Sequence, residues 1–265
     1  MHLTPVISRY WPFANGSGRI LDKFASSISL GAGERVAHTS DGFPMHVYAE
    51  DLIGRHILMS GKFDRSIVQV LLDNARTDDV LLDIGANIGY VSACFLAKVK
   101  GSTACCIEPQ PGVVDLLRKN MAQFGNRADV MQFGLADRDG TLRFHVDAAN
   151  RGASQISEEG ETEIPVREAR NVLKAMKKID LIKIDVEGFE KVIFQSIGEE
   201  LKRLQPRAIL FEDQTGAAAP DGVIGSILTA AGYRIYGIDK RLLKTVLIPV
   251  RSANDCQFND YIAKR

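Results

Sequence analysis

Several features that this sequence lacks argue against particular classes of protein. It has no run of 18 or more apolar residues, so we expect no membrane-spanning helix. Lysine plus arginine and aspartate plus glutamate both total 33, and this zero net charge favours neither a nucleic-acid partner nor a basic membrane patch. Prolines and polar residues interrupt the start of the chain, which therefore lacks a signal-like apolar core. These absences predict a cytoplasmic location.

Cysteine is also scarce and shows no C-x-x-C spacing. The four cysteines are Cys94, Cys105, Cys106 and Cys256. Adjacent residues of a strand point to opposite faces, so Cys105 and Cys106 cannot both face one side. We interpret all four as small core residues in a reducing compartment rather than as metal ligands or disulfide partners.

The length predicts one large domain with an N-terminal addition. A domain of roughly 200 residues leaves part of the 265-residue chain over, so we expect an arm over residues 1–60 and the main domain over 61–265. In the arm, Phe43–Tyr48 and Leu52–Met59 are predicted as short strands. The aromatic cluster of Tyr10, Trp11 and Phe13 is expected to dock the arm on the main domain. A lid over a substrate cleft or a homodimer contact are the alternatives.

One stretch carries the pattern of a nucleotide-binding βαβ unit. An apolar run ends at Asp83 and is followed by a turn containing Gly85, Asn87 and Gly89 and then by a helical pattern. A second apolar run, Thr103–Ile107, ends at Glu108 and Pro109. The glycines let the backbone approach a ligand, and the acid after the second strand is placed to accept from ribose hydroxyls.

The charges of this unit favour S-adenosylmethionine over NAD. Asp83 would repel a pyrophosphate, no lysine or arginine lies between Asp83 and Tyr90, and the G-x-G-x-x-G spacing is absent. S-adenosylmethionine instead places an amino group and a sulfonium near this loop. An NAD-dependent oxidoreductase remains the first alternative.

Further along, charged residues follow predicted strand ends. Leu181–Ile184 is a predicted strand that leads into Asp185 and Glu187, and Ala208–Phe211 leads into Glu212 and Asp213. In an open α/β sheet, the carboxyl ends of the strands face the ligand crevice. A third strand, Asp129–Phe133, ends at residues 134–137, where adenine would contact Leu135. We also predict an edge strand over Thr141–Val146, a long loop over Asp147–Glu163 and a helix over Arg167–Lys178.

Together these motifs resemble the FkbM family of S-adenosylmethionine-dependent methyltransferases. The resemblance rests on Asp83–Tyr90 (DIGANIGY), Glu108-Pro109, Leu181–Gly188 (LIKIDVEG) with Glu190, and Asn259-Asp260, and it runs from about Asp51 to Lys264. It implies a class I methyltransferase fold, which is α/β and Rossmann-like, with a seven-stranded sheet whose last strand is antiparallel and with helices on both faces. It also implies O-methylation of a sugar, a glycan or a related secondary metabolite. Such a hydroxyl-bearing small molecule or glycan is the expected partner.

From the residues and the resemblance we predict the site. Cofactor-binding residues are expected to be Asp83, Gly85, Asn87, Gly89, Glu108, Pro109, Leu135 and Asp185. Asp83 would receive the methionine amino end or hold the loop. The predicted catalytic set is Lys183, Asp185, Glu187 and Glu212, with Asp185 the first and Glu187 the second choice of base. The alternative for these two acids is an ion pair with Lys183 or a place at a helix N-terminus.

Two further alternatives concern metal and activity. Asp185, Glu187, Glu212 and Asp213 could together bind Mg²⁺, although no metal is part of the predicted site. The chain could also be a non-catalytic S-adenosylmethionine-binding protein. The charged strand end from Lys183 to Glu187 argues for chemistry instead.

Overall fold

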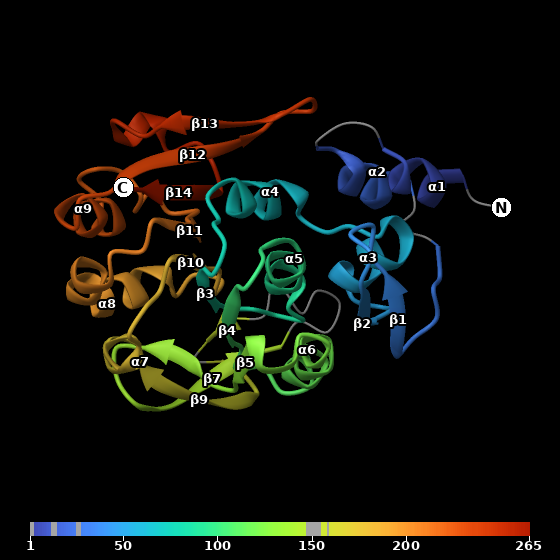
Figure 1. Cartoon of the computed structure of the whole chain (residues 1–265), viewed down its shortest axis with the longest axis horizontal. Coiled ribbons are helices and arrows are strands. Elements are labelled where there is room, and N and C mark those ends of the chain that lie inside the picture. The colour runs from blue at the N-terminus through green and yellow to red at the C-terminus, as the bar shows by residue number, and fades with distance from the viewer. Residues whose placement is uncertain (1–2, 12–14, 25–27, 147–154, 158) are drawn as a thin grey trace.

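A central sheet of eight strands organises the protein (Figure 1). The computed structural model describes residues 3–11, 15–24, 28–146, 155–157 and 159–265. The strands follow the order β13-β12-β14-β11-β10-β3-β4-β5 across the sheet. Their bounds are β3 (Val80–Ile84), β4 (Thr103–Ile107), β5 (Ala128–Met131), β10 (Leu181–Ile184), β11 (Ala208–Glu212), β12 (Arg234–Lys240), β13 (Thr245–Pro249) and β14 (Asp260–Lys264).

Strand direction in this sheet agrees with the predicted α/β class. The strands β5, β4, β3, β10 and β11 are parallel, whereas β14 runs antiparallel between β11 and β12. The predicted fold is therefore confirmed, including its final antiparallel strand. The strand count is eight rather than seven, because β13 folds back on β12 and adds an edge strand, with Gly237 opposite Ile248.

Helices cover both faces of the sheet, and each face has its own apolar core. Leu81 packs in one core and its neighbour Leu82 in the other, because adjacent residues of a strand point to opposite sides. One core includes residues of the helices α4 (Arg65–Asp73), α5 (Tyr90–Lys98) and α6 (Val113–Ala122). The other includes residues of α7 (Ala169–Ala175), α8 (Glu190–Leu204) and α9 (Val223–Ala230). Cys106 belongs to the first core and Cys105 packs against the second, so they face opposite sides as predicted.

The N-terminal elements lie beside α6 and α4 (Figure 1). They are α1 (Leu3–Arg9), α2 (Ser17–Phe24), the hairpin of β1 (Glu34–His38) and β2 (Pro44–Tyr48), and α3 (Leu52–Ser60). Asn120 of α6 fixes the hairpin, since its side-chain amide accepts from the His46 amide at 2.6 Å and donates to the His46 carbonyl at 2.9 Å. The strand predicted over Phe43–Tyr48 corresponds to β2.

The strand predicted over Leu52–Met59 is wrong, because these residues form the helix α3. The Asp51 carboxylate caps its start by accepting from the amides of Ile53 (3.1 Å) and Gly54 (3.4 Å). Gly61 ends it in the left-handed conformation, with φ of 73°. The apolar run of this segment suits either a strand or a helix, and the caps at both ends favour the helix.

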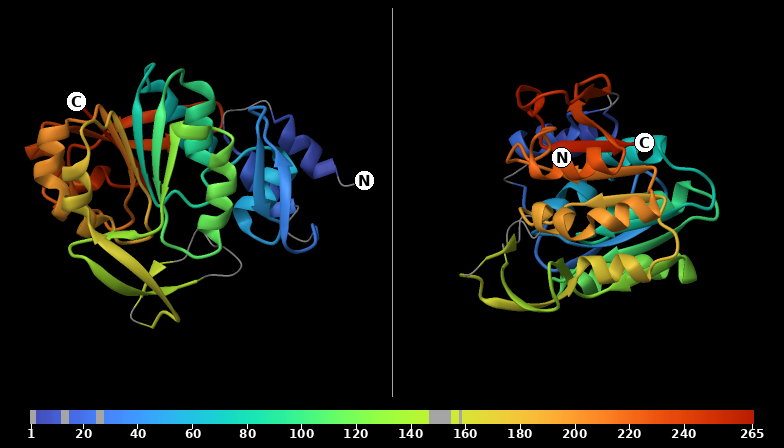
Figure 2. Two further views of the ribbon diagram at one scale, coloured as in Figure 1. Left: turned by 60° about the horizontal axis from the view of Figure 1, so that its bottom comes forward. Right: turned by 90° about the vertical axis from the view of Figure 1, so that its left-hand side faces the viewer.

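A second sheet of four strands projects from the end of the main sheet (Figure 2). Its order is β6-β9-β7-β8, with β6 (Gly134–Ala136), β7 (Gly140–His145), β8 (Gln155–Ile156) and β9 (Thr162–Glu168). Leu135 therefore lies in a separate strand rather than at the end of β5. The loop predicted over Asp147–Glu163 contains β8 and the start of β9, whereas residues 147–154, with Arg151 and Ser154, lie outside the described part. The helix predicted from Arg167 begins at Ala169, because β9 continues to Glu168.

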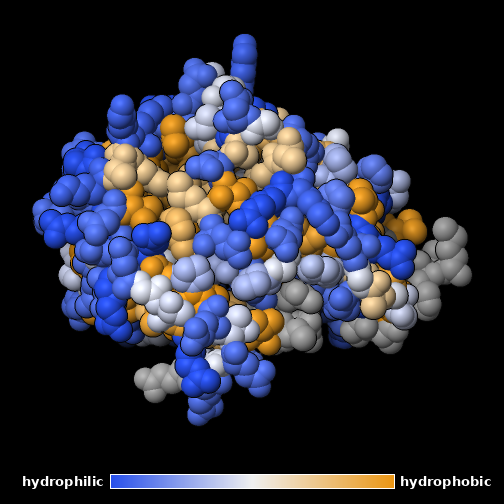
Figure 3. Space-filling model, turned by 90° about the horizontal axis from the view of Figure 1, so that it is seen from below, coloured by the Kyte–Doolittle hydropathy of each residue, from blue (hydrophilic) through white to orange (hydrophobic). Residues whose placement is uncertain are grey.

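In the described residues, no helix has both the length and the apolar character needed to cross a membrane. The face seen from below shows hydrophobic residues between hydrophilic ones across the middle of the molecule (Figure 3).

Candidate active site

A cavity of about 370 Å³ lies at the carboxyl ends of the central parallel strands. It brings together stretches that are far apart in the chain, namely the loop after β3, the end of β4 and the segment after β10. Of the predicted site residues, those that line it are Gly85, Asn87, Glu108, Pro109, Leu135, Lys183, Asp185, Glu187 and Glu212. Asp83 and Gly89 are not among the lining residues and support the cavity from behind.

The loop after β3 owes its shape to two glycines. Gly85 has a φ of 76°, and a Cβ atom there would lie 1.8 Å from the Asp185 carbonyl oxygen. Gly89 has a φ of 84°, and its Cβ would meet Leu117 and Met121 of α6 at 2.6 and 2.8 Å. Both positions therefore require glycine, which lets the loop pack between the end of β10 and α6.

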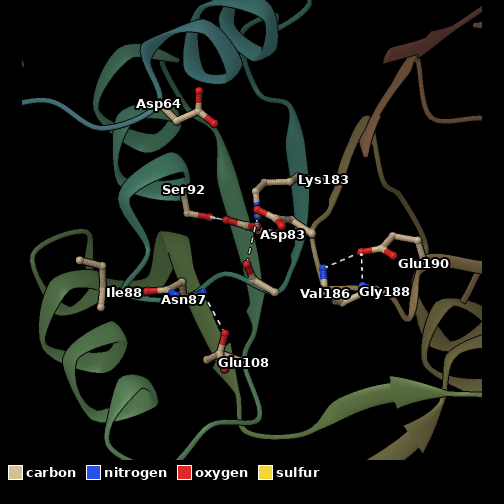
Figure 4. A network of polar contacts seen from close by, with 12 residues as sticks. Asp64, Asp83, Asn87, Ile88, Ser92, Glu108, Lys183, Val186, Gly188 and Glu190 are labelled. Atoms are coloured by element: carbon tan, nitrogen blue, oxygen red, sulfur yellow. Dashed lines mark hydrogen bonds and ion pairs between the residues drawn. The ribbon is translucent and has the colours of Figure 1, made fainter. Parts of the chain in front are cut away.

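Asp83 and Lys183 form a buried ion pair beneath this loop (Figure 4). Lys183 Nζ lies 3.3 Å from Asp83 and 3.2 Å from Asp185, and it donates to the Gly85 carbonyl at 3.0 Å. Asp83 is fully buried and also accepts from the Ser92 hydroxyl at 2.7 Å. Burial alone would lower the pKa of Lys183, but attraction by Asp185 and Asp83 outweighs it and raises this pKa. The ion pair places Asp83 beneath the loop, and the choice between its two predicted roles stays a prediction.

Glu108 ends β4 beside the same loop. Its two carboxylate oxygens accept from the backbone amides of Asn87 and Gln110, each at 2.9 Å. Burial raises the pKa of Glu108 to about 7, although these two hydrogen bonds act to lower it. A carboxylate oxygen has more than one lone pair, so Glu108 can still accept from a ligand in the cavity.

Three carboxylates gather past the ends of β10 and β11. Asp185, Glu187 and Glu212 each offer an oxygen within 4.8 Å of the other two. Burial and the neighbouring charges of Glu212 and Asp185 raise the pKa of Glu187 to about 7. Burial and the charge of Asp185 raise the pKa of Glu212 to about 7 against a hydrogen bond from Gln214. The predicted catalytic acids are therefore adjacent, and two of them can exchange a proton near neutral pH.

The turn that carries Glu187 is held by the first residue of α8. The Glu190 carboxylate accepts from the amides of Val186 (3.1 Å) and Gly188 (3.3 Å), as Figure 4 shows. Glu187 itself has a φ of 51°, a conformation that costs energy for any residue with a side chain. The hydrogen bonds of Glu190 stabilise this turn and keep Glu187 at the cavity.

Carboxylate oxygens suit Mg²⁺ as ligands. The observed cluster has three acids, whereas four were considered from the sequence. Asp213 accepts from the Thr215 and Ala218 amides at 2.9 and 2.8 Å and is not part of the group. Acidic residues commonly gather without a metal, so this arrangement assigns none.

A second charged cluster lines the same cavity and was not predicted. Lys240 Nζ lies 3.0 Å from Asp64, just before α4, and 2.8 Å from Asp260, at the start of β14. Asn259 and Asp260 belonged to the recognised motif but had no assigned role. Asp64 and Lys240 are 176 residues apart, and no local pattern in the sequence signals their pairing.

Comparisons with known proteins show similarity to methyltransferases. The family model described as the methyltransferase FkbM domain matches residues 83–235. The chain is 29% identical to the hexuronic acid methyltransferase AglP of Haloferax volcanii over 143 residues, which are 52% of this chain and 58% of that protein. It is 25% identical to the 2-O-methyltransferase NoeI of Sinorhizobium fredii over 58% of this chain and 70% of that protein.

Longer but weaker similarity extends over most of the chain. The 31-O-demethyl-FK506 methyltransferase FkbM of Streptomyces tacrolimicus is 24% identical over 79% of this chain and 89% of its own length. A crystal structure of methyltransferase FkbM from Methylobacillus flagellatus aligns with 79% of this chain and 52% of its own, at 14% identity and a TM-score of 0.46. Because the family model covers more than half of the chain, including the loop after β3 and the acids after β10, this chain belongs to the FkbM family of S-adenosylmethionine-dependent methyltransferases.

Proposed function

We propose that this protein transfers a methyl group from S-adenosylmethionine to a hydroxyl oxygen of a sugar, a glycan or a related secondary metabolite. The observation that carries the proposal is the cavity itself, in which the loop after β3 and Glu108 lie beside the carboxylates of Asp185, Glu187 and Glu212. Two relatives named for O-methylation support this reaction, and a relative named for a hexuronic acid supports a sugar as the class of acceptor, not its charge.

The residues at the loop suit S-adenosylmethionine. Glu108 can accept from ribose hydroxyls, and Leu135 and Pro109 offer apolar contacts for adenine. Gln110 lines the cavity with a buried side chain whose Nε2 has no hydrogen-bond partner, so a ligand acceptor there would satisfy it. The described loop residues Gly85–Gly89 carry no cation for a pyrophosphate. Asp83 would act through Lys183, by holding the loop.

For the reaction, the chain must remove a proton from the acceptor hydroxyl. S-adenosylmethionine supplies an electrophilic methyl group when bound, and an ordinary hydroxyl is a weak nucleophile. We assign the base to Glu187 rather than to Asp185, reversing the order expected from the sequence, because Asp185 is ion-paired with Lys183 and Glu187 has a pKa near 7. Asp185 and Glu212 would orient the hydroxyl, and this positioning supplies much of the rate.

A methyltransferase, an NAD-dependent oxidoreductase and a non-catalytic cofactor-binding protein differ in the results they predict for a binding experiment. Calorimetric titration with S-adenosylhomocysteine and, separately, with NAD⁺ should show binding of S-adenosylhomocysteine alone. Glu108→Ala should weaken that binding about tenfold or more, because the ribose loses a charged acceptor. Binding of NAD⁺ alone would refute the proposal. A non-catalytic cofactor-binding protein would bind S-adenosylhomocysteine but would show no methyl transfer, whether as wild type or as Glu187→Gln.

A further inference from the structure

Two lysines are among the described residues that line the cavity, and each is already held by two carboxylates. Lys183 lies between Asp83 and Asp185, and Lys240 lies between Asp64 and Asp260. Among the described residues that line the cavity, there is no arginine and no histidine. Among these described residues, an acceptor that carries a carboxylate or a phosphate would therefore find no cation that is not already paired.

The described residues that line the cavity include more acidic side chains than lysines. Six acids line the cavity against the two lysines, and they are Asp64, Glu108, Asp185, Glu187, Glu212 and Asp260. Asp260 stands opposite Glu212 in the pairing of β14 with β11, so the Lys240 cluster adjoins the proposed catalytic acids. Like charges in a partly enclosed site repel strongly, which disfavours an anionic acceptor.

The Lys240 cluster can bind neutral hydroxyl groups. An ammonium has three protons, and Asp64 and Asp260 occupy two of them, which leaves one for an acceptor oxygen. The two carboxylates retain lone pairs that can accept from hydroxyl protons. Neighbouring hydroxyls of one molecule, each both a donor and an acceptor, match this alternation of ammonium and carboxylate groups.

Apolar residues from two separate regions complete the lining. Ile53 and Phe63 come from the segment around α3, and Phe144, Ile156 and Ile164 come from the small sheet. Figure 4 shows Asp64 on the segment that leads into α4, directly after Phe63 in the chain. Hydroxyl-binding groups beside apolar side chains suit a ring with polar edges and carbon–hydrogen faces.

We propose that Asp64, Lys240 and Asp260 form the acceptor-binding subsite, and that the enzyme selects an uncharged polyhydroxyl compound over an anionic one such as a uronate. This inference rests on the proposed function and adds the charge class of the substrate.

The test compares acceptors that differ by a single group. S-adenosylhomocysteine formation would be measured with p-nitrophenyl glucoside against the glucuronide, and with the galactoside against the galacturonide. The neutral member of a pair should react with a kcat/KM about tenfold or more above that of its uronate. Preference for the uronate would overturn the inference while leaving the proposed methyl transfer intact. Failure to bind S-adenosylhomocysteine in calorimetry would instead overturn the proposed function and this inference with it.

Variants of the cluster test the subsite itself. Asp64→Asn and Lys240→Met should each raise the KM for the neutral acceptor about tenfold, while the Kd for S-adenosylhomocysteine changes less than about twofold. Asp239→Asn is the matched control, because Asp239 adjoins Lys240 in β12 but pairs with Arg241. The subsite assignment is wrong if Asp64→Asn and Lys240→Met leave the KM at the value of the control.

Discussion

Asp83 and Lys183 meet as a buried ion pair whose residues come from the adjacent parallel strands β3 and β10. The two residues are direct partners in the strand register, and their charged atoms lie 3.3 Å apart. Lys183 also reaches Asp185 and the Gly85 carbonyl, so one ammonium connects the loop after β3 to the acids after β10. The two halves of the proposed active site are therefore coupled through a single side chain.

Removing this ammonium should destabilise the fold and loosen the loop. Lys183→Met leaves Asp83 buried without its cation, and breaking a buried pair typically costs about 3–5 kcal/mol. We expect a large fall in Tm and weaker binding of S-adenosylhomocysteine, measured by calorimetry.

A surface lysine provides the control for this substitution. Lys202 forms an exposed pair with Glu199 on α8, so Lys202→Met should leave Tm nearly unchanged. Adding Asp83→Asn to Lys183→Met should recover part of the lost stability, because the unpaired charge is removed. Equal Tm values for Lys183→Met and Lys202→Met would contradict the importance of the buried pair.

The pH dependence of turnover should reveal the proposed base. The pKa of Glu187 is raised to about 7 by burial and by the charges of Glu212, Asp185 and Glu190, against the opposing charge of Lys183. A base acts when deprotonated, so kcat/KM should increase as the pH rises through about 7 and then level off. Glu187→Gln should lower kcat about 100-fold or more and reduce this increase, which Glu108 and Glu212 share because their pKa values are also about 7. An unchanged rate and profile in Glu187→Gln, matching those of the exposed control Glu199→Gln, would exclude this residue as the base.

Through Glu108, the stability of the fold should decrease as the pH rises, whereas kcat/KM increases. Its pKa in the folded protein, about 7, lies above the ordinary value of 4.5, so the folded state binds more protons than the unfolded state between these two values. The stability that protonated Glu108 contributes is complete below about pH 4.5 and is lost as the pH rises through 7. We expect Tm to fall as the pH is raised from about 5 to about 7.5.

Glu108→Gln should reduce this fall without abolishing it, because the pKa values of Glu187 and Glu212 are raised as well. The exposed residue Glu163 serves for comparison, and Glu163→Gln should keep the wild-type slope. A slope in Glu108→Gln equal to that of Glu163→Gln would show that Glu108 is ionised throughout this range.

The sequence predicted the loop after β3 and Glu108 well, since their signals are local. An acid at a strand end, glycines at fixed spacing and a second acid after the next strand all lie within one βαβ unit. The neighbouring position of Asp185 and Glu187 also followed, because the carboxyl ends of parallel strands meet at one edge of a sheet. The cofactor and base roles assigned to these residues stay predictions.

Pairings between distant segments could not be predicted in this way. Lys240 meets Asp64 only because β12 is brought next to the start of α4, and neither residue stands out in its own segment. Leu52–Ser60 shows a different limit, since its apolar run suits a strand as well as a helix and the outcome depends on the Asp51 cap. In the small sheet, the strand over Thr141–Val146 was predicted as an edge strand and corresponds to β7, but its pairing with β8 and β9 was missed because no local pattern signals which strands pair.

The N-terminal segment is fastened to the main sheet through Asn15. The Asn15 side chain accepts from the Ser66 hydroxyl of α4 and donates to the Arg241 carbonyl at 2.6 Å, and its backbone amide donates to the Leu242 carbonyl at 3.2 Å. These contacts hold the arm through Asn15, whereas docking was expected from the aromatic cluster, of which Tyr10 is 77% exposed and Phe13 lies outside the described residues. They also join the start of α4 to the turn between β12 and β13, which are the segments that follow Asp64 and Lys240.

Asn15→Ala should therefore release the arm while leaving the cofactor site intact. Loss of these hydrogen bonds should cost about 1–3 kcal/mol of stability and speed proteolytic cleavage of the N-terminal 60 residues, because Ser66 and the turn between β12 and β13 lose their common partner. Limited proteolysis followed by mass spectrometry would locate the cleavage, and the Kd for S-adenosylhomocysteine should stay within about twofold of wild type. Asn171→Ala is the control, since Asn171 makes its hydrogen bond to Glu168 on the exposed surface of α7. If cleavage of the Asn15→Ala arm is no faster than in Asn171→Ala, the arm is held by its apolar contacts with α3 and not by this residue.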